Sequence, residues 1–203
     1  MISPHAFVHS TAVVEPLAEI QDHVKVWHFC HIRENAVLEH RVSLGRDVYV
    51  DIGVRVGHHT RIQNGVSVFQ GLTVSPWGFI GPHAIFTNDP APRVGSKSWK
   101  IVPTVLETGM SIGAGAIIRC GITIGAFAMI GAGAIVTKNV PPFHLAVGFP
   151  AECRQMVCAC GQTFLPIATN DKELVRDCCL RNLVPELLTE VQDLMKKRRM
   201  SLR

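Results

Sequence analysis

The segment GPHAIFTNDPAPRVGSKSWKIVPT, residues 81–104, carries side chains that could form a polar site. The amide of Asn88 can donate and accept hydrogen bonds, but it is not basic enough to take up a proton. The carboxylate of Asp89 could act as a base, although an aspartate before a proline is also an ordinary turn residue. Arg93 and Lys100 add positive charge to the same segment. These residue types predict a hydrogen-bonding or acid–base site in an exposed loop.

A six-residue hydrophobic repeat surrounds this segment. An apolar residue recurs at every sixth position from Val8 to Phe86, and the repeat resumes at Leu106 and continues to Val136. A small or medium-sized apolar residue follows most of these four positions later, so both side chains face the same side of short strands. Three such hexads bring the chain back to its starting side, one strand spacing higher. The repeat predicts a three-sided parallel β-helix with about 18 residues per coil and an aliphatic interior.

The repeat also predicts the number of coils and the length of the insertion. Counted from Val8, about seven coils are expected, starting near residues 8, 26, 44, 62, 80, 106 and 124. If Leu106 opens the coil after the one that starts at Ile80, about eight residues are looped out of the fifth coil. This insertion, at about residues 87–105, is rich in proline and contains Trp99. Loops on rigid scaffolds commonly carry function, so we expect it to border a site.

The C-terminal part of the chain departs from the repeat. We therefore expect a β-helix domain at residues 1–152, followed by a connector and a helical cap at residues 153–203. One helix is expected to begin at Asn170 or Asp171 and a second at Pro185. A solenoid needs its terminal strands covered, so we expect these helices to lie over the open end of the β-helix.

Composition excludes several classes of function. The net charge is only +4, and much of it comes from the run KKRR near the C-terminus, so no nucleic-acid-binding surface is expected. There is no apolar run of about 18 residues, so no membrane span is expected. The first residues lack a basic region followed by an apolar stretch, so they are not a secretory signal. Seven cysteines form no evident disulfide framework, which favours a reducing cytoplasm.

Four of the cysteines could in principle hold a metal ion. Cys158 and Cys160 are separated by one residue, and Cys178 and Cys179 are adjacent. Structural zinc sites usually have two to four residues between the cysteines of each pair, and a helix at 178–179 would point the two side chains apart. The spacing therefore favours no metal site.

The repeats themselves identify a family resemblance. Hexads such as IGAGAI and IGAFAM resemble those of hexapeptide-repeat acyltransferases, whose members form left-handed β-helices. More specifically, VWHFCHI, IQNGVSV, GPHAIFTND, PTVLETGMSIGAGAIIRCGITIG and VGFPA are similar to a subgroup that N-acetylates nucleotide-linked 3-amino sugars. This resemblance implies acetyl-CoA as co-substrate and a homotrimer with the active site between subunits.

The resemblance leaves two substrate branches open. The segment VCACGQTF is similar to the tail of enzymes acting on UDP-2-acetamido-3-amino-2,3-dideoxy-glucuronate, and FTNDPAPR is at least as close to enzymes acting on dTDP-3-amino-3,6-dideoxyhexoses. Either branch implies a role in making cell-surface polysaccharide. A uronate carboxylate would require a cation, for which Arg93 and Lys100 are the candidates in the loop.

Specific residues follow from the resemblance. Asn88 falls on the asparagine that contacts the reacting sugar, where it would orient the amine, while water or the departing thiolate takes the proton. Asp89 is the alternative base. The candidate substrate-binding residues are His28, Gln63, Asn64, Phe69, Phe86, Arg93 and Lys100. The candidate CoA-binding residues are Gly113, Ala114, Gly131, Ala132, Lys138 and Arg154.

Two other classes of protein share features with this sequence. The segment IQNGVSVF echoes the metal-binding pattern of γ-type carbonic anhydrases, but Phe69 stands where those enzymes have a histidine ligand. A non-catalytic solenoid scaffold would account for the repeats and would leave the loop at 87–105 unexplained.

Overall fold

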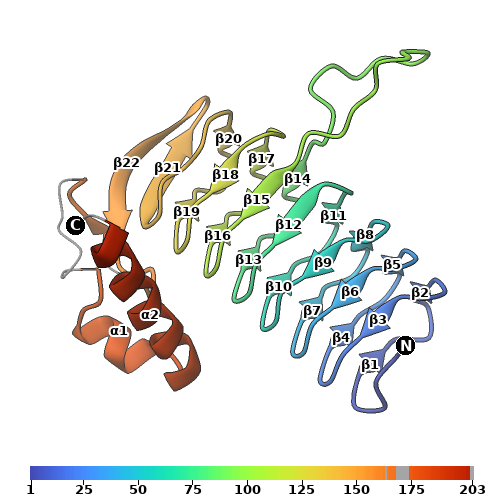
Figure 1. Cartoon of the computed structure of the whole chain (residues 1–203), viewed down its shortest axis with the longest axis horizontal. Helices are drawn as coiled ribbons and strands as arrows, with labels where there is room; N and C mark the ends of the chain where they lie inside the picture. Colours follow the sequence, from blue (N-terminus) through green and yellow to red (C-terminus); the bar gives the residue numbers. More distant parts are fainter. Residues whose placement is uncertain (163, 168–173, 202–203) are drawn as a thin grey trace.

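In the computed structural model, residues 1–162, 164–167 and 174–201 are described, with side chains up to Lys197 in the last segment. The chain winds into a long parallel β-helix, with two helices near its C-terminal end and one loop standing away from the coils (Figure 1). No described helix combines the length and the apolar character that crossing a membrane requires.

Short strands form three faces, which we name in chain order. The first face contains β1 (Phe7–Val8), β4 (Lys25–Val26), β7 (Ser43–Leu44), β10 (Arg61–Ile62), β13 (Phe79–Ile80), β16 (Ser111–Ile112), β19 (Met129–Ile130) and β21 (His144–Gly148). The second face contains β2 (Val13–Val14), β5 (His31–Ile32), β8 (Tyr49–Val50), β11 (Ser67–Val68), β14 (Ile85–Phe86), β17 (Ile117–Ile118) and β20 (Ile135–Val136). The third face contains β3 (Glu19–Ile20), β6 (Val37–Leu38), β9 (Arg55–Val56), β12 (Leu72–Val74), β15 (Thr104–Leu106) and β18 (Thr123–Ile124). The first corner joins the first face to the second, the second corner joins the second to the third, and the third corner returns to the first.

The apolar repeat fills the interior. In each early coil the paired residues are 18 positions apart, as in Val8 with Val26 and Leu44 with Ile62. The second residue of nearly every strand points inward, and one continuous cluster of buried aliphatic side chains runs through the stack. Burial of these side chains is the main contribution to the stability of the coil.

The insertion is longer than the repeat predicted. Ile80 pairs with Ile112, and Val74 pairs with Leu106, in both cases 32 positions apart instead of 18. The loop therefore adds fourteen residues, not eight. Leu106 lies on the third face, so it closes the fifth coil and does not open the sixth. The next coils start at Ile112 and Ile130 on the first face, and residues 106 and 124 are not coil starts.

The last coil is completed by a hairpin. Seven coils have strands on all or most of their faces, and β21 begins an eighth, close to the number predicted. From β21 the chain reverses into β22 (Ala151–Val157), which pairs antiparallel with it, and β23 (Phe164–Leu165) pairs with β22. Ala151 and Cys153 pack against the apolar interior, so β22 covers the end of the coil. The domain boundary expected between residues 152 and 153 falls inside this strand.

The helices lie beside the coils. The helix expected from Asn170 or Asp171 begins later, as α1 (Asp177–Asn182), and residues 168–173 lie outside the described part of the chain. The second helix, α2 (Pro185–Ser201), begins at the expected proline. Val191 and Met195 of α2 are buried with Phe127 and Phe143, which are third-corner residues. The helical region thus packs along the third corner, while β22 covers the open end (Figure 1).

Leu38 and Val37 provide a test of the interior packing. Leu38 of β6 is fully buried, whereas its neighbour Val37 points outward and is half-buried. We expect Leu38→Ala to lower the free energy of unfolding by about 2–5 kcal/mol, because it leaves a cavity in a close-packed stack. Val37→Ala should cost about 1 kcal/mol or less. Urea unfolding of both variants measures the difference, and equal losses would contradict the inward and outward assignment.

Candidate functional site

The first corner forms a continuous ladder along the coils. Backbone amides connect each turn to the turn before it, with N···O distances of 2.8–3.0 Å from Asp47 to His28, Gly65 to Arg46, His83 to Asn64, Gly115 to Pro82 and Gly133 to Ala114. Because the coils stack in register, side chains at equivalent positions form columns along this corner. The structure therefore brings the predicted substrate residues His28 and Asn64 into line with the predicted CoA residues Ala114 and Ala132.

The small residues of this corner are required by packing. A Cβ on Gly113 would lie 2.4 Å from the amide nitrogen of Ala132, and one on Gly131 would lie 2.7 Å from Val147. Neither glycine therefore needs a ligand to explain it. The exposed Ala114 and Ala132 leave a smooth strip along the sixth and seventh coils, past which an extended ligand could lie close to the backbone.

A groove lies against the first face over earlier coils than this strip, lined by residues between His23 and Phe79. Its volume is about 1300 Å³, and one wall is formed by Leu183 and Val184 of the link between α1 and α2 together with Leu187 of α2. The predicted substrate residues His28, Gln63 and Asn64 line it. Four basic side chains and three aromatic rings also line it: Lys25, Arg41, Arg46, Arg61, Trp27, Trp77 and Phe79. Among the described residues no carboxylate lines the groove, although Arg46 also pairs with Asp47 at its rim at 2.8 Å.

Charge and aromatic surface together suit one kind of ligand. Arginine and lysine side chains bind phosphate oxygens, and aromatic rings stack on planar bases. The groove is therefore suited to an anionic nucleotide.

Histidines and a tryptophan pack where the helices meet the third corner. The rings of His59 and Trp77 stack with centroids 3.9 Å apart, and the Nδ1 atoms of His58 and His59 are 3.0 Å apart. The indole Nε1 of Trp77 donates a hydrogen bond of 2.8 Å to Glu190 of α2. Partial burial lowers the pKa of His59, and the neighbouring His58 acts in the same direction. The groove wall is thus held by contacts between α2 and this corner.

Asn88 lies at the second corner, where the loop leaves the coil. Its backbone carbonyl accepts a hydrogen bond of 2.9 Å from Val102, so the two stems of the loop are joined there. Its side-chain Nδ2 donates a long hydrogen bond of 3.4 Å to the carbonyl of Gln70. Within the described part of the chain, no hydrogen bond to its Oδ1 is present. Asp89 accepts a 2.8 Å hydrogen bond from the amide of Ala91, which is the contact of a turn residue.

The other predicted residues have different surroundings. Arg93 and Lys100 are exposed in the loop, and Phe69 is half-buried with its ring 6.1 Å from that of Tyr49. Phe86 is 3% exposed and points into the apolar interior, where packing accounts for it. Thus the loop offers cations to solvent, but Phe86 offers no surface to a ligand.

Two predicted CoA residues lie away from the first corner. Lys138 follows β20 as Asn88 follows β14, and both strands belong to the second face, where each pairs with β17. Lys138 therefore lies at the second corner, on the same side of the coil as Asn88. Arg154 is exposed on β22 and forms an ion pair of 2.8 Å with Glu152. Only the four small residues among the CoA candidates therefore share one corner.

A polar network at the second corner was missed by the sequence analysis. Arg33 donates a 2.9 Å hydrogen bond to the hydroxyl of Tyr49, which donates one of 3.0 Å to Asp51. Arg33 Nε lies 2.7 Å from Glu15 as an ion pair without an aligned hydrogen bond, and the guanidinium lowers the pKa of Glu15. Asp51 in turn accepts from the amide of Gln70, the residue that contacts Asn88. Glu15, Arg33 and Asp51 are spaced 18 residues apart, so comparing the outward-facing positions of successive coils would have placed them in one column.

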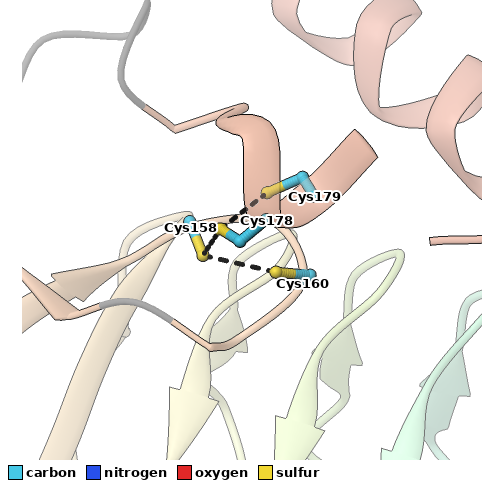
Figure 2. Close-up of side chains that lie close together, drawn as sticks. All are labelled: Cys158, Cys160, Cys178 and Cys179. Atoms are coloured by element: carbon cyan, nitrogen blue, oxygen red, sulfur yellow. Dashed lines mark hydrogen bonds between the residues drawn. The ribbon is translucent and has the colours of Figure 1, made fainter. Parts of the chain in front are cut away.

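The cysteines depart from the expected arrangement. Cys178 and Cys179 lie at the start of α1, yet their sulfurs are 4.0 Å apart and face the same neighbours (Figure 2). The expectation that a helix separates them was wrong, because the first turn of α1 directs both towards the turn that carries Cys158 and Cys160. All seven cysteines are in the described part of the chain, and no disulfide joins any of them.

Comparison with known proteins agrees with the fold. The family model described as the hexapeptide repeat of succinyl-transferase matches residues 103–138. A dTDP-3-amino-3,6-dideoxy-alpha-D-galactopyranose 3-N-acetyltransferase of Aneurinibacillus thermoaerophilus is 46% identical over 57 residues, which cover 28% of this chain and 30% of that relative. A serine acetyltransferase of Buchnera aphidicola is 32% identical over 112 residues, which cover 54% of this chain and 36% of the relative. The chain thus spans about a third of the length of these relatives.

One structurally similar protein has been solved with acetyl coenzyme A bound. A hexapeptide-repeat acetyltransferase of Vibrio cholerae, solved with acetyl coenzyme A, is 26% identical with a TM-score of 0.53, over 60% of this chain and 70% of that one. Fold and likeness together define the fold class: the chain is a left-handed parallel β-helix, as predicted, and its residues 103–138 match the hexapeptide-repeat model. Within that class, the relatives named above are acetyltransferases, and one of them acts on a nucleotide-linked 3-amino sugar.

The lowered pKa of His59 at the third corner predicts that the folded state loses stability in acid. Since burial lowers the pKa of His59, the folded state favours the neutral ring. Its contribution is present above the unfolded pKa of about 6.5 and is lost as the pH falls through the lower folded value. The fall in Tm from about pH 8 to about pH 5 should be smaller in His59→Gln than in the parent. His5→Gln serves as a control on an exposed ring; an equal fall in the parent and in His59→Gln would contradict the assignment.

Proposed function

We propose that this protein is an acetyl-CoA-dependent N-acetyltransferase that acts on the 3-amino group of a nucleotide-diphosphate-linked amino sugar. The observation that supports this most is that the cationic groove and the small residues Ala114 and Ala132 share the first corner, where His28 and Asn64 of the groove lie in the same column. The groove would hold the nucleotide and its diphosphate. The strip at Ala114 and Ala132 would hold the pantetheine chain of CoA against the backbone.

Amide formation from a thioester sets the chemical requirements. The attacking amine must be neutral and aligned with the thioester carbonyl, and the developing oxyanion needs hydrogen-bond donors. The new C–N bond forms as the C–S bond breaks, and the amine proton leaves to water or to the departing thiolate. The chain need supply only orientation and oxyanion contacts, and the proposed reaction uses no metal ion.

Asn88 suits the role of orienting the amine. Its Oδ1 can accept an amine N–H, while its backbone and Nδ2 are fixed by Val102 and Gln70. The hydrogen bond from Ala91 fixes Asp89 as a turn residue, which makes it the weaker candidate for a base. We infer that Asn88 acts by position and not by taking the proton.

A neighbouring subunit would complete the site. Asn88 and the strip lie at opposite edges of the second face, so a single chain does not bring them together. The loop projects from the coils and could reach the first corner of an adjacent copy (Figure 1). We therefore propose a homotrimer with the active site between subunits, in which Arg93 and Lys100 of the loop approach the sugar. A carboxylate on the sugar would pair with these cations.

The acceptor is the finer part of the proposal. We favour UDP-2-acetamido-3-amino-2,3-dideoxy-glucuronate, and the 46% identical relative supports a dTDP-linked 3-amino-3,6-dideoxyhexose as the alternative. The resemblance to serine acetyltransferases covers more of the chain at lower identity, and serine has neither nucleotide nor phosphate to occupy the groove.

Nucleotide-linked amino sugars of this kind are used in cell-surface polysaccharide synthesis, which we propose as the pathway. The cysteines without disulfides support a cytoplasmic location.

A substrate panel tests the proposed function. Release of the CoA thiol is followed with acetyl-CoA and UDP-linked or dTDP-linked 3-amino sugars, with and without a C6 carboxylate, and with serine. We expect turnover with a nucleotide-linked amino sugar, an N-acetyl product by mass spectrometry, and inhibition by the free nucleoside diphosphate. Turnover of serine alone, or no binding of acetyl-CoA by calorimetry, would refute the proposal.

Asn88→Ala tests the orienting role. Loss of one positioning hydrogen bond should lower kcat by about ten- to a hundredfold, because a misaligned amine reacts slowly. The KM for acetyl-CoA and the native mass should stay the same. Asn139→Ala is the matched control, since Asn139 caps the amide of Thr123 at 2.9 Å in a later coil. Turnover by Asn88→Ala at the parent rate would show that the assigned role is wrong.

A further inference from the structure

Four cysteine sulfurs converge outside the proposed active site. Cys158 Sγ lies 3.5 Å from Cys160 Sγ and 3.6 Å from Cys178 Sγ, and Cys178 Sγ lies 4.0 Å from Cys179 Sγ. All four sulfurs are within 4.8 Å of one another (Figure 2). The group contains no histidine or carboxylate from the described residues.

The spacing of the sulfurs fits a metal ion better than it fits disulfides. A disulfide requires about 2.05 Å between sulfurs, far less than any of these distances. Four Zn–S bonds of about 2.3 Å in a tetrahedron separate the sulfurs by about 3.8 Å. Three of the sulfur separations, at 3.5, 3.6 and 4.0 Å, lie on either side of this value.

The local backbone prepares the ligands. Cys158 begins a tight turn and Cys160 lies within it, and the turn is closed by a 2.8 Å hydrogen bond from the amide of Gly161 to the carbonyl of Cys158. Gly161 has φ of +73°, which favours glycine, and this turn directs both sulfurs to one side. Cys178 and Cys179 approach from the first turn of α1, so two separate segments supply two ligands each.

Backbone groups next to the cluster also suit thiolate ligands. Hydrogen bonds from the backbone at Gln162 and Arg176 reach the sulfurs of Cys160 and Cys179, as amides facing metal-bound thiolates do. A metal ion bound by such a group displaces the thiol protons.

We propose that Cys158, Cys160, Cys178 and Cys179 form a closed, structural Zn²⁺ site. Four thiols would release four protons and bind Zn²⁺ with no position left for water, which distinguishes a structural site from a catalytic one. Soft thiolate ligands in a tetrahedral arrangement favour zinc over the harder cations.

The site would fasten the helices to the coil. Cys158 follows β22, which covers the last coil, and α1 leads directly into α2, which forms a wall of the groove. A helix of six residues such as α1 has little stability of its own. The zinc ion would therefore fix α1 against the β22 turn and, through α1, hold α2 along the third corner.

Metal analysis of the untagged protein tests the site. We expect about one zinc per chain by plasma mass spectrometry. Replacement by Co²⁺ should give the strong sulfur-to-cobalt charge-transfer and d–d bands of a tetrahedral tetrathiolate. A sulfur-bound iron in place of zinc would overturn the metal identity. Parent protein that remains metal-free after exposure to Zn²⁺, or a mass two units lower for each disulfide, would overturn the site.

Variants separate the site from a general effect of cysteine loss. Cys158→Ser with Cys178→Ser should lose the zinc, whereas Cys153→Ser, on the preceding strand, should keep it. If the double variant does not fold, the cobalt spectrum of the parent still decides. Metal content does not depend on the acceptor or on acetyl transfer. The zinc site can therefore be refuted while the proposed acetyltransferase function holds, and the function can be refuted while the zinc site holds.

Discussion

Every part of this molecule depends on the in-register stacking of inward-facing aliphatic side chains. Each coil places an apolar residue of nearly every strand over the equivalent residue of the coil before it, as Leu44 lies over Val26. The interior of such a narrow prism is filled by these side chains, and the buried polar residues Thr60 and Thr104 hydrogen bond to backbone groups of neighbouring turns. Chemistry is therefore confined to the outward strand positions, the corners and the single long loop.

Stacking in register also turns sequence spacing into spatial order. Residues 18 apart, or 32 apart across the loop, form columns that run along the corners. One column places His28 and Asn64 in line with the small residues of the sixth and seventh coils. Another places Glu15, Arg33 and Asp51 below the stem of the loop. A long ligand such as CoA or a nucleotide sugar could use such a column, because its contacts also repeat along the coil.

The fold was predictable from the sequence because the repeat is redundant. A misassigned apolar residue in one coil does not alter the predicted period, because many other coils show the same six-residue spacing. The length of the loop was not predictable from the sequence. The six-residue hydrophobic repeat is the same on all three faces, so Leu106 could have lain on any of them. Only the pairing of Val74 with Leu106 decides this.

Local spacing was a poor guide to sites built from separate segments. C-x-C and C-C each depart from the usual zinc pattern, but the hairpin of β22 and the position of α1 bring all four sulfurs together. The groove was likewise hidden, because its cations lie 5 to 36 positions apart along the chain and one of its walls comes from the C-terminal region. Asn88 is a candidate because it lies where the loop interrupts the repeat, which is a signal visible in the sequence itself.

The central claim is that the first corner holds both substrates and that the loop of an adjacent subunit completes the site. A crystal structure of the protein with CoA and a nucleoside diphosphate tests it most directly. The account predicts the pantetheine chain beside Ala114 and Ala132, the diphosphate among Lys25, Arg41 and Arg61, and Asn88 of a neighbouring copy near the thiol. CoA bound along another corner, or a nucleotide outside the groove, would contradict it.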